Sequence, residues 1–183
     1  MKKLIIFAVA LLLMSGTASS ADVGFGLFNS TTDHTDANVS VEGLAFQNFY
    51  HVYVWGHVRT AETGFVSWEF KLVKSNGDFK MNVTFTDPAT MVIGSGPFDP
   101  AGWTVAGVDC YGEGWNMVAD IEMMYMGAPG TIEMMDDPDT GASIYADCAT
   151  VEHPADLLTT FGINMGGVGT KESSWGAVKS MYK

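Results

Sequence analysis

Hydrophobic and polar residues alternate with a period of two along most of the chain between Val23 and Ala149. This alternation is typical of strands with one buried and one solvated face, and Gly, Pro, Asn and Asp separate the alternating runs. No stretch of this span repeats its apolar residues with the 3.6-residue period of an amphipathic helix. We therefore expect an all-β domain, with strands over residues 23–28, 38–46, 49–59, 64–74, 79–86, 90–94, 103–111, 117–126, 131–136 and 143–149.

Turn residues between neighbouring runs predict two hairpins. Asn76-Gly77 is the preferred sequence for a two-residue type I′ turn, and a second turn is expected at residues 127–130. In each hairpin, folding about the turn brings apolar residues together on one face. The expected pairs are Leu72/Met81, Phe70/Val83 and Trp68/Phe85 in the first hairpin, and Tyr125/Ile132 and Met123/Met134 in the second.

The two ends of the chain depart from the alternating pattern. Residues 1–21 combine a basic start at Lys2 and Lys3, an apolar run over 4–14 and small residues at 19–21, which is typical of a cleavable signal peptide. We expect cleavage after Ala21, secretion or release into the periplasm, and no lipid anchor, because no cysteine follows the cleavage site. The β domain is expected over residues 22–150, and residues 151–183 are predicted to form a Gly-rich tail with a short amphipathic helix.

Charge and cysteine content narrow the possible partners. The chain has 21 Asp and Glu against nine Lys and Arg, a net charge of −12, and loss of Lys2 and Lys3 with the signal peptide makes it −14. Such a surface repels phosphate backbones, so nucleic acid is not expected as a partner. Cys110 and Cys148 are the only cysteines, and in an oxidising compartment a single pair predicts a disulfide rather than a metal or redox site.

The strand expected over residues 49–59 carries the candidate binding face. Val52, Val54 and Val58 alternate toward the core, and the opposite face carries His51, Tyr53, Trp55, His57 and Arg59. Flat rings with polar tips suit the recognition of an extracellular protein or a polysaccharide, because the rings stack while the tips form hydrogen bonds. The alternative is that the N-terminal strands or the tail cover this face, since large aromatic side chains are usually at least partly buried.

The sequence offers two candidate metal sites and no recognised catalytic motif. Asp136, Asp137 and Asp139 share one turn and offer oxygen ligands for Ca²⁺, although Asp, Pro and Gly are also ordinary turn residues. Methionines gather between residues 117 and 135, where they fill a core or bind Cu(I). The sequence has no Gly-x-Ser-x-Gly or His-Glu-x-x-His motif and no cysteine outside the expected disulfide. We therefore predict no enzyme activity and, calcium apart, no cofactor.

Five features of the chain combine into a pattern: the run Val66-Ser-Trp-Glu-Phe-Lys-Leu72, the Asn76-Gly77 turn, the run Gly130-Thr-Ile-Glu-Met-Met135, the cysteine pair, and the ending Ser174-Trp-Gly-Ala-Val-Lys-Ser-Met-Tyr-Lys183. Together they resemble the cohesin-like, immunoglobulin-type β-sandwiches of secreted bacterial proteins. The resemblance implies a non-catalytic binding or surface-structural module, and it names no ligand. The chain departs from cohesins in having no linked modules and no dockerin-type repeat, which does not fit cellulosome-like assembly.

A different architecture also fits the alternation. Many alternating strands after a signal peptide are typical of a small outer-membrane β-barrel. Against it, the chain has two cysteines, and several expected strands are shorter than the roughly nine residues that a membrane-spanning strand needs. We therefore expect an antiparallel immunoglobulin-like β-sandwich that interacts with a protein or a carbohydrate. A secreted enzyme and a metal-binding protein are less favoured alternatives.

Overall fold

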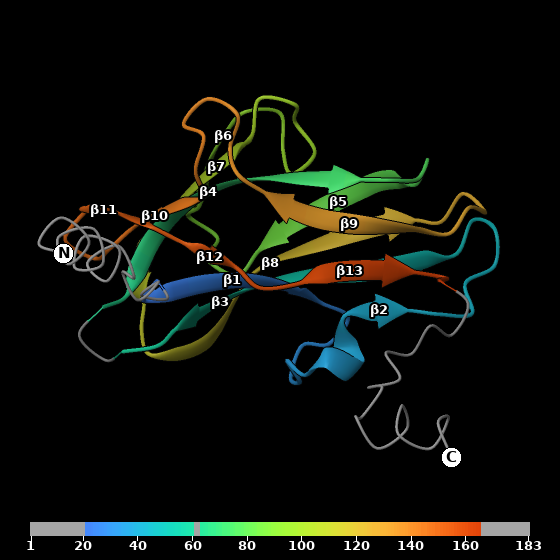
Figure 1. Ribbon diagram of the computed structural model, residues 1–183, viewed down its shortest axis with the longest axis horizontal. Helices are drawn as coiled ribbons and strands as arrows, with labels where there is room; N and C mark the ends of the chain where they lie inside the picture. Colours follow the sequence, from blue (N-terminus) through green and yellow to red (C-terminus); the bar gives the residue numbers. More distant parts are fainter. Residues whose placement is uncertain (1–20, 61–62, 166–183) are drawn as a thin grey trace, which may run out of the picture.

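The computed structural model describes residues 21–60 and 63–165, and its regular elements are strands apart from one short 3-10 helix, η1 (Asp36–Asn38) (Figure 1). The expected signal peptide, except Ala21, and the expected C-terminal helix lie outside these residues. No helix in the described part of the chain is long and apolar enough to cross a membrane. The strands are β1 (Val23–Phe28), β2 (Ser40–Val41), β3 (Phe49–Val58), β4 (Phe65–Lys74), β5 (Phe79–Phe85), β6 (Met91–Ile93), β7 (Trp103–Tyr111), β8 (Gly114–Met124), β9 (Gly130–Met135), β10 (Ile144–Ala146), β11 (Glu152–Pro154), β12 (Asp156–Leu157) and β13 (Thr160–Ile163).

The strands form two sheets that pack face to face (Figure 1). Sheet A has the order β12-β1-β3-β8-β5, and sheet B has the order β11-β10-β4-β9-β13-β2, with β7 joining β4 to β6. Both sheets have open edges, at β5 in sheet A and at β6 in sheet B. The chain is therefore the expected sandwich, and it does not form the single closed sheet of the alternative architecture.

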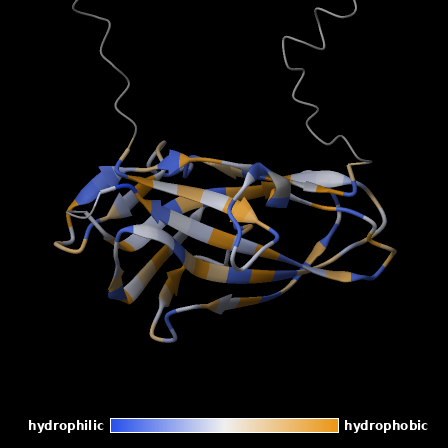
Figure 2. Cartoon of the chain, turned by 90° about the horizontal axis from the view of Figure 1, so that it is seen from below, coloured by the Kyte–Doolittle hydropathy of each residue, from blue (hydrophilic) through white to orange (hydrophobic). Residues whose placement is uncertain are grey.

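The core between the sheets is made by the inward positions of the alternating runs, and the hydropathy colours of Figure 2 change from residue to residue along the strands accordingly. Val52 and Val54 of β3 and Phe70 of β4 have no exposed surface, as the alternation predicts. Phe25 of β1 meets Phe65 of β4 edge to face, with ring centroids 5.3 Å apart. Such aromatic pairs add to the free energy gained from burial and hold the two sheets in contact.

The predicted hairpin about Asn76-Gly77 is wrong. β4 pairs with β7, β9 and β10 in sheet B, whereas β5 pairs with β8 in sheet A, so the chain crosses between the sheets at residues 75–78. A type I′ turn needs positive φ at both central residues, and neither Asn76 nor Gly77 has it. Asn76 instead donates hydrogen bonds from its side chain to Asp78 and to the backbone oxygen of Ala128.

The second predicted hairpin is wrong for a related reason. β8 pairs with β3 and β5 in sheet A, and β9 pairs with β4 and β13 in sheet B, so residues 125–129 are a second crossing. The apolar residues of both strands do face the core, and Tyr125, Met123 and Ile132 are buried. They face one another between the sheets instead of lying beside one another in one sheet.

The β domain extends beyond the predicted boundary at residue 150. β12 runs parallel to β1, where Gly24 pairs with Asp156, and β13 pairs with both β9 and β2. These strands have two to four residues, too few for a period-two pattern to be recognised in the sequence. The strand predicted over residues 38–46 is likewise reduced to β2, two residues long.

Candidate functional site

The five candidate binding residues lie on or next to β3, with side chains toward the outer face of sheet A, because the alternating Val52, Val54 and Val58 point into the core. The segment of residues 29–38, which follows β1, runs beside this face and divides it into two parts. We call them the covered half, around Trp55 and His57, and the open half, around Phe49, His51 and Tyr53.

In the covered half, Trp55 is 7% exposed. Its Nε1 donates a hydrogen bond to the backbone oxygen of Ser30, 3.3 Å away, and the ring of His34 lies 4.0 Å from the Trp55 ring centroid. Trp115 of β8 stacks on both His34 and His57, at centroid distances of 4.9 and 4.5 Å. Trp55 is therefore packed under residues 29–38. The sequence offered coverage of this face as an alternative, with the N-terminal strands or the tail as the covering segment, whereas the segment after β1 covers it here.

Burial sets the charge of the two histidines in this cluster. Desolvation lowers the pKa of His34; the Asp33 carboxylate opposes the shift and a charge on His57 adds to it. Desolvation also lowers the pKa of His57, and the neighbouring Arg59 adds to that shift. Both rings are therefore uncharged at neutral pH. Arg59 also forms a 2.5 Å ion pair with Asp156 of β12.

In the open half, His51 and Tyr53 remain accessible. The His51 Nδ1 lies 2.8 Å from the Asp120 Oδ1, and the rings of His51 and Tyr53 stack with centroids 5.8 Å apart and planes at 9°. Burial and the Asp120 carboxylate raise the pKa of Tyr53, so its hydroxyl stays a hydrogen-bond donor. A shallow hollow of about 560 Å³ adjoins these rings, and its other polar lining comes mainly from residues 29–31 and Asn38.

An exposed apolar row crosses sheet A beside the open half. Phe49 of β3 and Phe79 of β5 both pair with Met124 of β8, so the three side chains lie side by side on the outer face. Phe49 is 55% exposed and Phe79 is 53% exposed. Sequence reasoning missed this row. A period of two puts residue 49 on the same face as His51, which is the signal that could have found Phe49, but the pairing of β3 and β5 with β8 gives no signal in the sequence.

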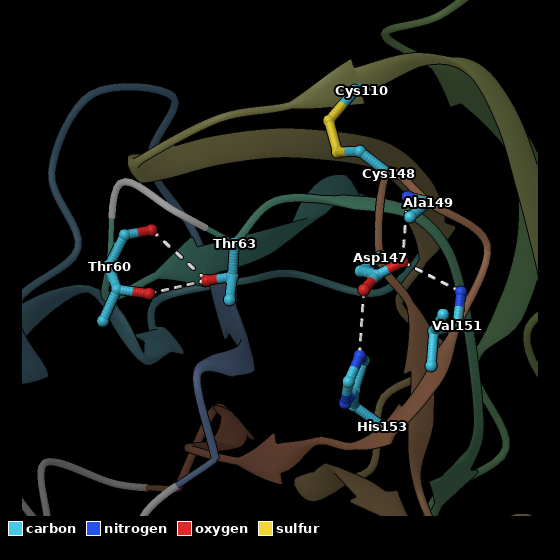
Figure 3. Close-up of polar contacts among 8 residues, drawn as sticks. All are labelled: Thr60, Thr63, Cys110, Asp147, Cys148, Ala149, Val151 and His153. Carbon is cyan, nitrogen blue, oxygen red and sulfur yellow. Dashed lines mark hydrogen bonds and ion pairs between the residues drawn. A yellow bond between two sulfur atoms is a disulfide. The ribbon is translucent and has the colours of Figure 1, made fainter.

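The predicted disulfide is present and joins the end of β7 to the loop after β10, with Cα atoms 5.6 Å apart (Figure 3). Asp147 organises this loop, because its Oδ1 accepts hydrogen bonds from the backbone N–H groups of Ala149 and Val151 while its Oδ2 lies 3.0 Å from the His153 Nε2. The Val151 hydrogen bond, followed by that of His153, lowers the pKa of Asp147. These contacts fix the loop that carries Cys148, so the disulfide joins two ordered segments.

Two of the three carboxylates of the predicted calcium turn accept hydrogen bonds from their own loop. Asp137 is buried, and its Oδ1 accepts hydrogen bonds from the backbone of Asp139 and Thr140. Asp136 accepts a hydrogen bond from Ser143, and Asp139 is exposed. Within residues 21–60 and 63–165 no group of three or more His, Cys, Asp or Glu is placed to hold a metal ion. Calcium binding at this turn stays a prediction.

The methionines between residues 117 and 135 do not lie on one face. Met123 and Met134 are buried in the core, whereas Met135 is 48% exposed on the outer side of sheet B and Met124 belongs to the apolar row of sheet A. Of the two interpretations of these methionines, core filling and Cu(I) binding, core filling accounts for the buried Met123 and Met134.

Comparison with known proteins gives structural likenesses. No protein-family model matches the sequence, and the search of curated proteins found no match. The cohesin module of a family 33 glycoside hydrolase from Clostridium perfringens aligns with a TM-score of 0.54 at 10% identity, over 80% of this chain and 98% of its own. The sixth cohesin of scaffoldin B from Acetivibrio cellulolyticus, solved with a Cel5 dockerin, gives 0.54 at 9% identity, over 80% and 99%.

A third likeness agrees with these two. The cohesin of a type I cohesin–dockerin complex from Clostridium thermocellum, formed by OlpC and Doc435, aligns with a TM-score of 0.52 at 13% identity, over 80% of this chain and 96% of its own. At such identities the likeness establishes the fold. The protein has a cohesin-like β-sandwich, which confirms the resemblance drawn from the sequence.

Proposed function

We propose that this protein is an exported, non-catalytic β-sandwich module that binds a protein partner through the outer face of sheet A. The observation that carries the proposal is the exposed apolar row of Phe49, Met124 and Phe79. Aromatic residues and Met are enriched at the centres of protein interfaces, and polar groups surround those centres. Here Asp120 and Glu122 of β8 supply the polar surroundings.

Two further observations support the proposal. The Cys110–Cys148 disulfide suits a protein that works outside the reducing cytosol. The similar solved structures include cohesins bound to dockerins, so this sandwich shape is used for protein recognition elsewhere. For this chain we propose a protein partner of the same general kind, and a dockerin is the first defined probe.

The one His–carboxylate pair in the open half gives little support to catalysis. His51 contacts Asp120 through Nδ1, but no described serine, threonine or cysteine forms a hydrogen bond with its other nitrogen. A nucleophile activated by this histidine would have to lie within hydrogen-bond reach. A pair without a nucleophile, stacked on Tyr53, suits recognition better than group transfer.

The binding test uses paired variants of the apolar row. Immobilised protein is exposed to purified dockerin and to proteins secreted by the native host, and each retained protein is purified and titrated calorimetrically. Phe49→Ser and Phe79→Ser are each expected to weaken its binding about tenfold or more, as central interface aromatics do. Thr84→Ala, exposed on the same face, is the matched control. Equal binding by all four proteins would reject this face as the interface.

Polysaccharide binding is a second candidate, and the hollow of the open half favours it. Its amide and hydroxyl lining, beside the Tyr53 ring, has the donors, acceptors and flat surface that a sugar needs. The test is retention on a polysaccharide array by wild type and Tyr53→Ala. Loss of retention only in the variant would place a sugar at this hollow. Retention of no polysaccharide by the wild-type protein would remove this candidate.

A further inference from the structure

The few basic side chains of this acidic protein are unevenly distributed. The described part of the chain has four Lys or Arg residues, and Arg59 is paired with Asp156. The other three are Lys71, Lys74 and Lys80. They line two adjoining hollows of about 220 and 240 Å³ between β4, β5 and the loop after β6. The hollows share Lys74, Phe98 and Pro100, so they form one groove with a basic rim, which we call the lysine groove.

Strands of both sheets and one loop build the lysine groove. Lys71 and Lys74 belong to β4 of sheet B, and Lys80 belongs to β5 at the edge of sheet A. The loop after β6 closes the groove, because its Pro97 carbonyl accepts a hydrogen bond from Leu72 N and a Cβ placed on Gly96 would lie 3.3 Å from the Lys80 Nζ. Lys71 and Lys80 therefore line neighbouring hollows, with Lys74 lining both, only in the folded sandwich.

The lysines of the groove form no direct ion pair with a described carboxylate, although the Ala101 hydrogen bond and, to a smaller extent, the charge of Lys71 lower the pKa of Asp99, which lines the groove. No ion pair joins any of the three lysines to a carboxylate among residues 21–60 and 63–165. Lys74 donates to the backbone oxygen of Asp78 and lies 5.9 Å from the Phe98 ring centroid. Asp99 also lines the groove, but its oxygens accept hydrogen bonds from the backbone of Ser95 and Ala101, which holds the loop.

The lining between the lysines defines the kind of ligand. Val73, Phe98 and Pro100 form an accessible apolar floor, whereas the Leu72 side chain is only 1% exposed, and Ser95 is the only uncharged polar side chain in the lining. A sugar polymer needs many hydrogen-bond partners, which this floor lacks. A peptide in which carboxylates alternate with apolar side chains matches it, because the carboxylates reach the lysines while the apolar groups cover the floor.

We propose that the lysine groove is a second binding site, which takes an acidic, partly apolar peptide segment of a protein partner. The site shares no residue with the apolar row of sheet A, although Lys80 follows Phe79 on β5. The protein's overall negative charge does not prevent such binding, since beyond about 8 Å the repulsion is largely screened at physiological ionic strength. Lysines around an apolar floor attract such a segment locally and exclude basic ones.

The test is fluorescence anisotropy with a labelled ten-residue peptide of alternating Glu and Val, and with a matched peptide carrying Gln in place of Glu. The Glu peptide is expected to bind wild type, and Lys71→Gln/Lys80→Gln is expected to weaken it about tenfold. Lys71→Arg/Lys80→Arg keeps the charge and is expected to retain binding within about threefold. Raising NaCl from about 0.15 to about 0.5 M is expected to weaken binding further.

Several results would overturn the proposal. They are equal binding of the Glu and Gln peptides, unchanged affinity in the Gln double variant, no binding of the Glu peptide to wild type, or binding of an oligogalacturonate in place of the peptide. Melting curves check that each variant is folded. Phe49→Ser is expected to bind the Glu peptide normally, so failure of the sheet A interface and failure of the lysine groove are distinguishable.

Discussion

Replacement of Asp78 by Ala tests whether a buried carboxyl group fixes the first crossing between the sheets. Asp78 has no exposed surface and accepts hydrogen bonds from the Tyr50 hydroxyl at 2.7 Å, the Met126 backbone N–H at 2.8 Å and the Asn76 side chain at 3.0 Å. It thus connects the crossing at residues 75–78 to β3 and to the end of β8. Burial, followed by the hydrogen bond to Asp78, raises the pKa of Tyr50, so its hydroxyl remains a donor.

The expected cost follows from the donors that lose their partner. Asn76 keeps its hydrogen bond to Ala128, so the orphaned donors are the Tyr50 hydroxyl and the Met126 N–H. An unsatisfied buried donor costs about 1–3 kcal/mol, so Asp78→Ala is expected to lower the free energy of unfolding by about 4 kcal/mol. For a domain of this size, the melting temperature would fall by roughly 8–16 °C.

Urea unfolding with the disulfide intact measures this loss. Asn82→Ala, an exposed position on β5, is the control and is expected to change the free energy of unfolding by less than about 0.5 kcal/mol. Tyr50→Phe alone is expected to cost about 1 kcal/mol. In a double-mutant cycle, Tyr50 and Asp78 are expected to couple by at least about 0.5 kcal/mol. A loss below about 1 kcal/mol for Asp78→Ala, or zero coupling, would refute the reasoning.

Three further predictions concern the disulfide, the histidine cluster and a close approach of the sheets. Cys110→Ser/Cys148→Ser, which opens a loop with a sequence separation of 38, is expected to lower the free energy of unfolding by about 4 kcal/mol, and a reducing agent should affect wild type but not the variant. Because the pKa values of His34 and His57 are lowered on folding, the unfolded chain binds more protons below pH 6.5. Their contribution to the free energy of unfolding is therefore complete above this pH and lost as the pH falls through the folded pKa values. If a His34→Phe/His57→Phe variant showed the same change of unfolding free energy with pH between 7 and 5 as wild type, this prediction would be wrong. Gly56→Ala places a Cβ 2.4 Å from the Phe65 ring and is expected to cost about 1–3 kcal/mol, whereas Gly77→Ala, with open space around it, is the neutral control in the same thermal melts.

The sequence allowed the strands and their inward residues to be predicted, but not the neighbours of each strand. A period of two fixes which side chains face the core, and Phe70 and Leu72 are buried as expected. The period does not show whether the next strand lies in the same sheet or in the opposite sheet. Asn76-Gly77 predicts a hairpin turn, but the Asn76 side chain instead donates a hydrogen bond to the Ala128 backbone oxygen at a crossing between the sheets. The disulfide was predictable because only one pairing of two cysteines exists.

The candidate site was predicted in part for the same physical reason. Alternation placed His51 and Tyr53 on the outer face, where both are accessible. It could not show that residues 29–38 cover Trp55, since that contact joins segments 25 residues apart without a periodic signal. The apolar row and the lysine groove each combine residues of different strands, and they are recognisable only once the strand order is known.

The parallel pairing of β1 with β12 has a consequence for how the chain becomes folded. Val23 begins β1, yet one of the two neighbours of β1 in sheet A, β12, starts at Asp156, near the far end of the domain. A chain that emerges N-terminus first cannot complete this sheet, or join Cys110 to Cys148, until nearly all of the domain is available. Folding that waits for distant segments is slow. For a protein that we propose is exported, slow folding leaves the chain unfolded while it crosses the membrane.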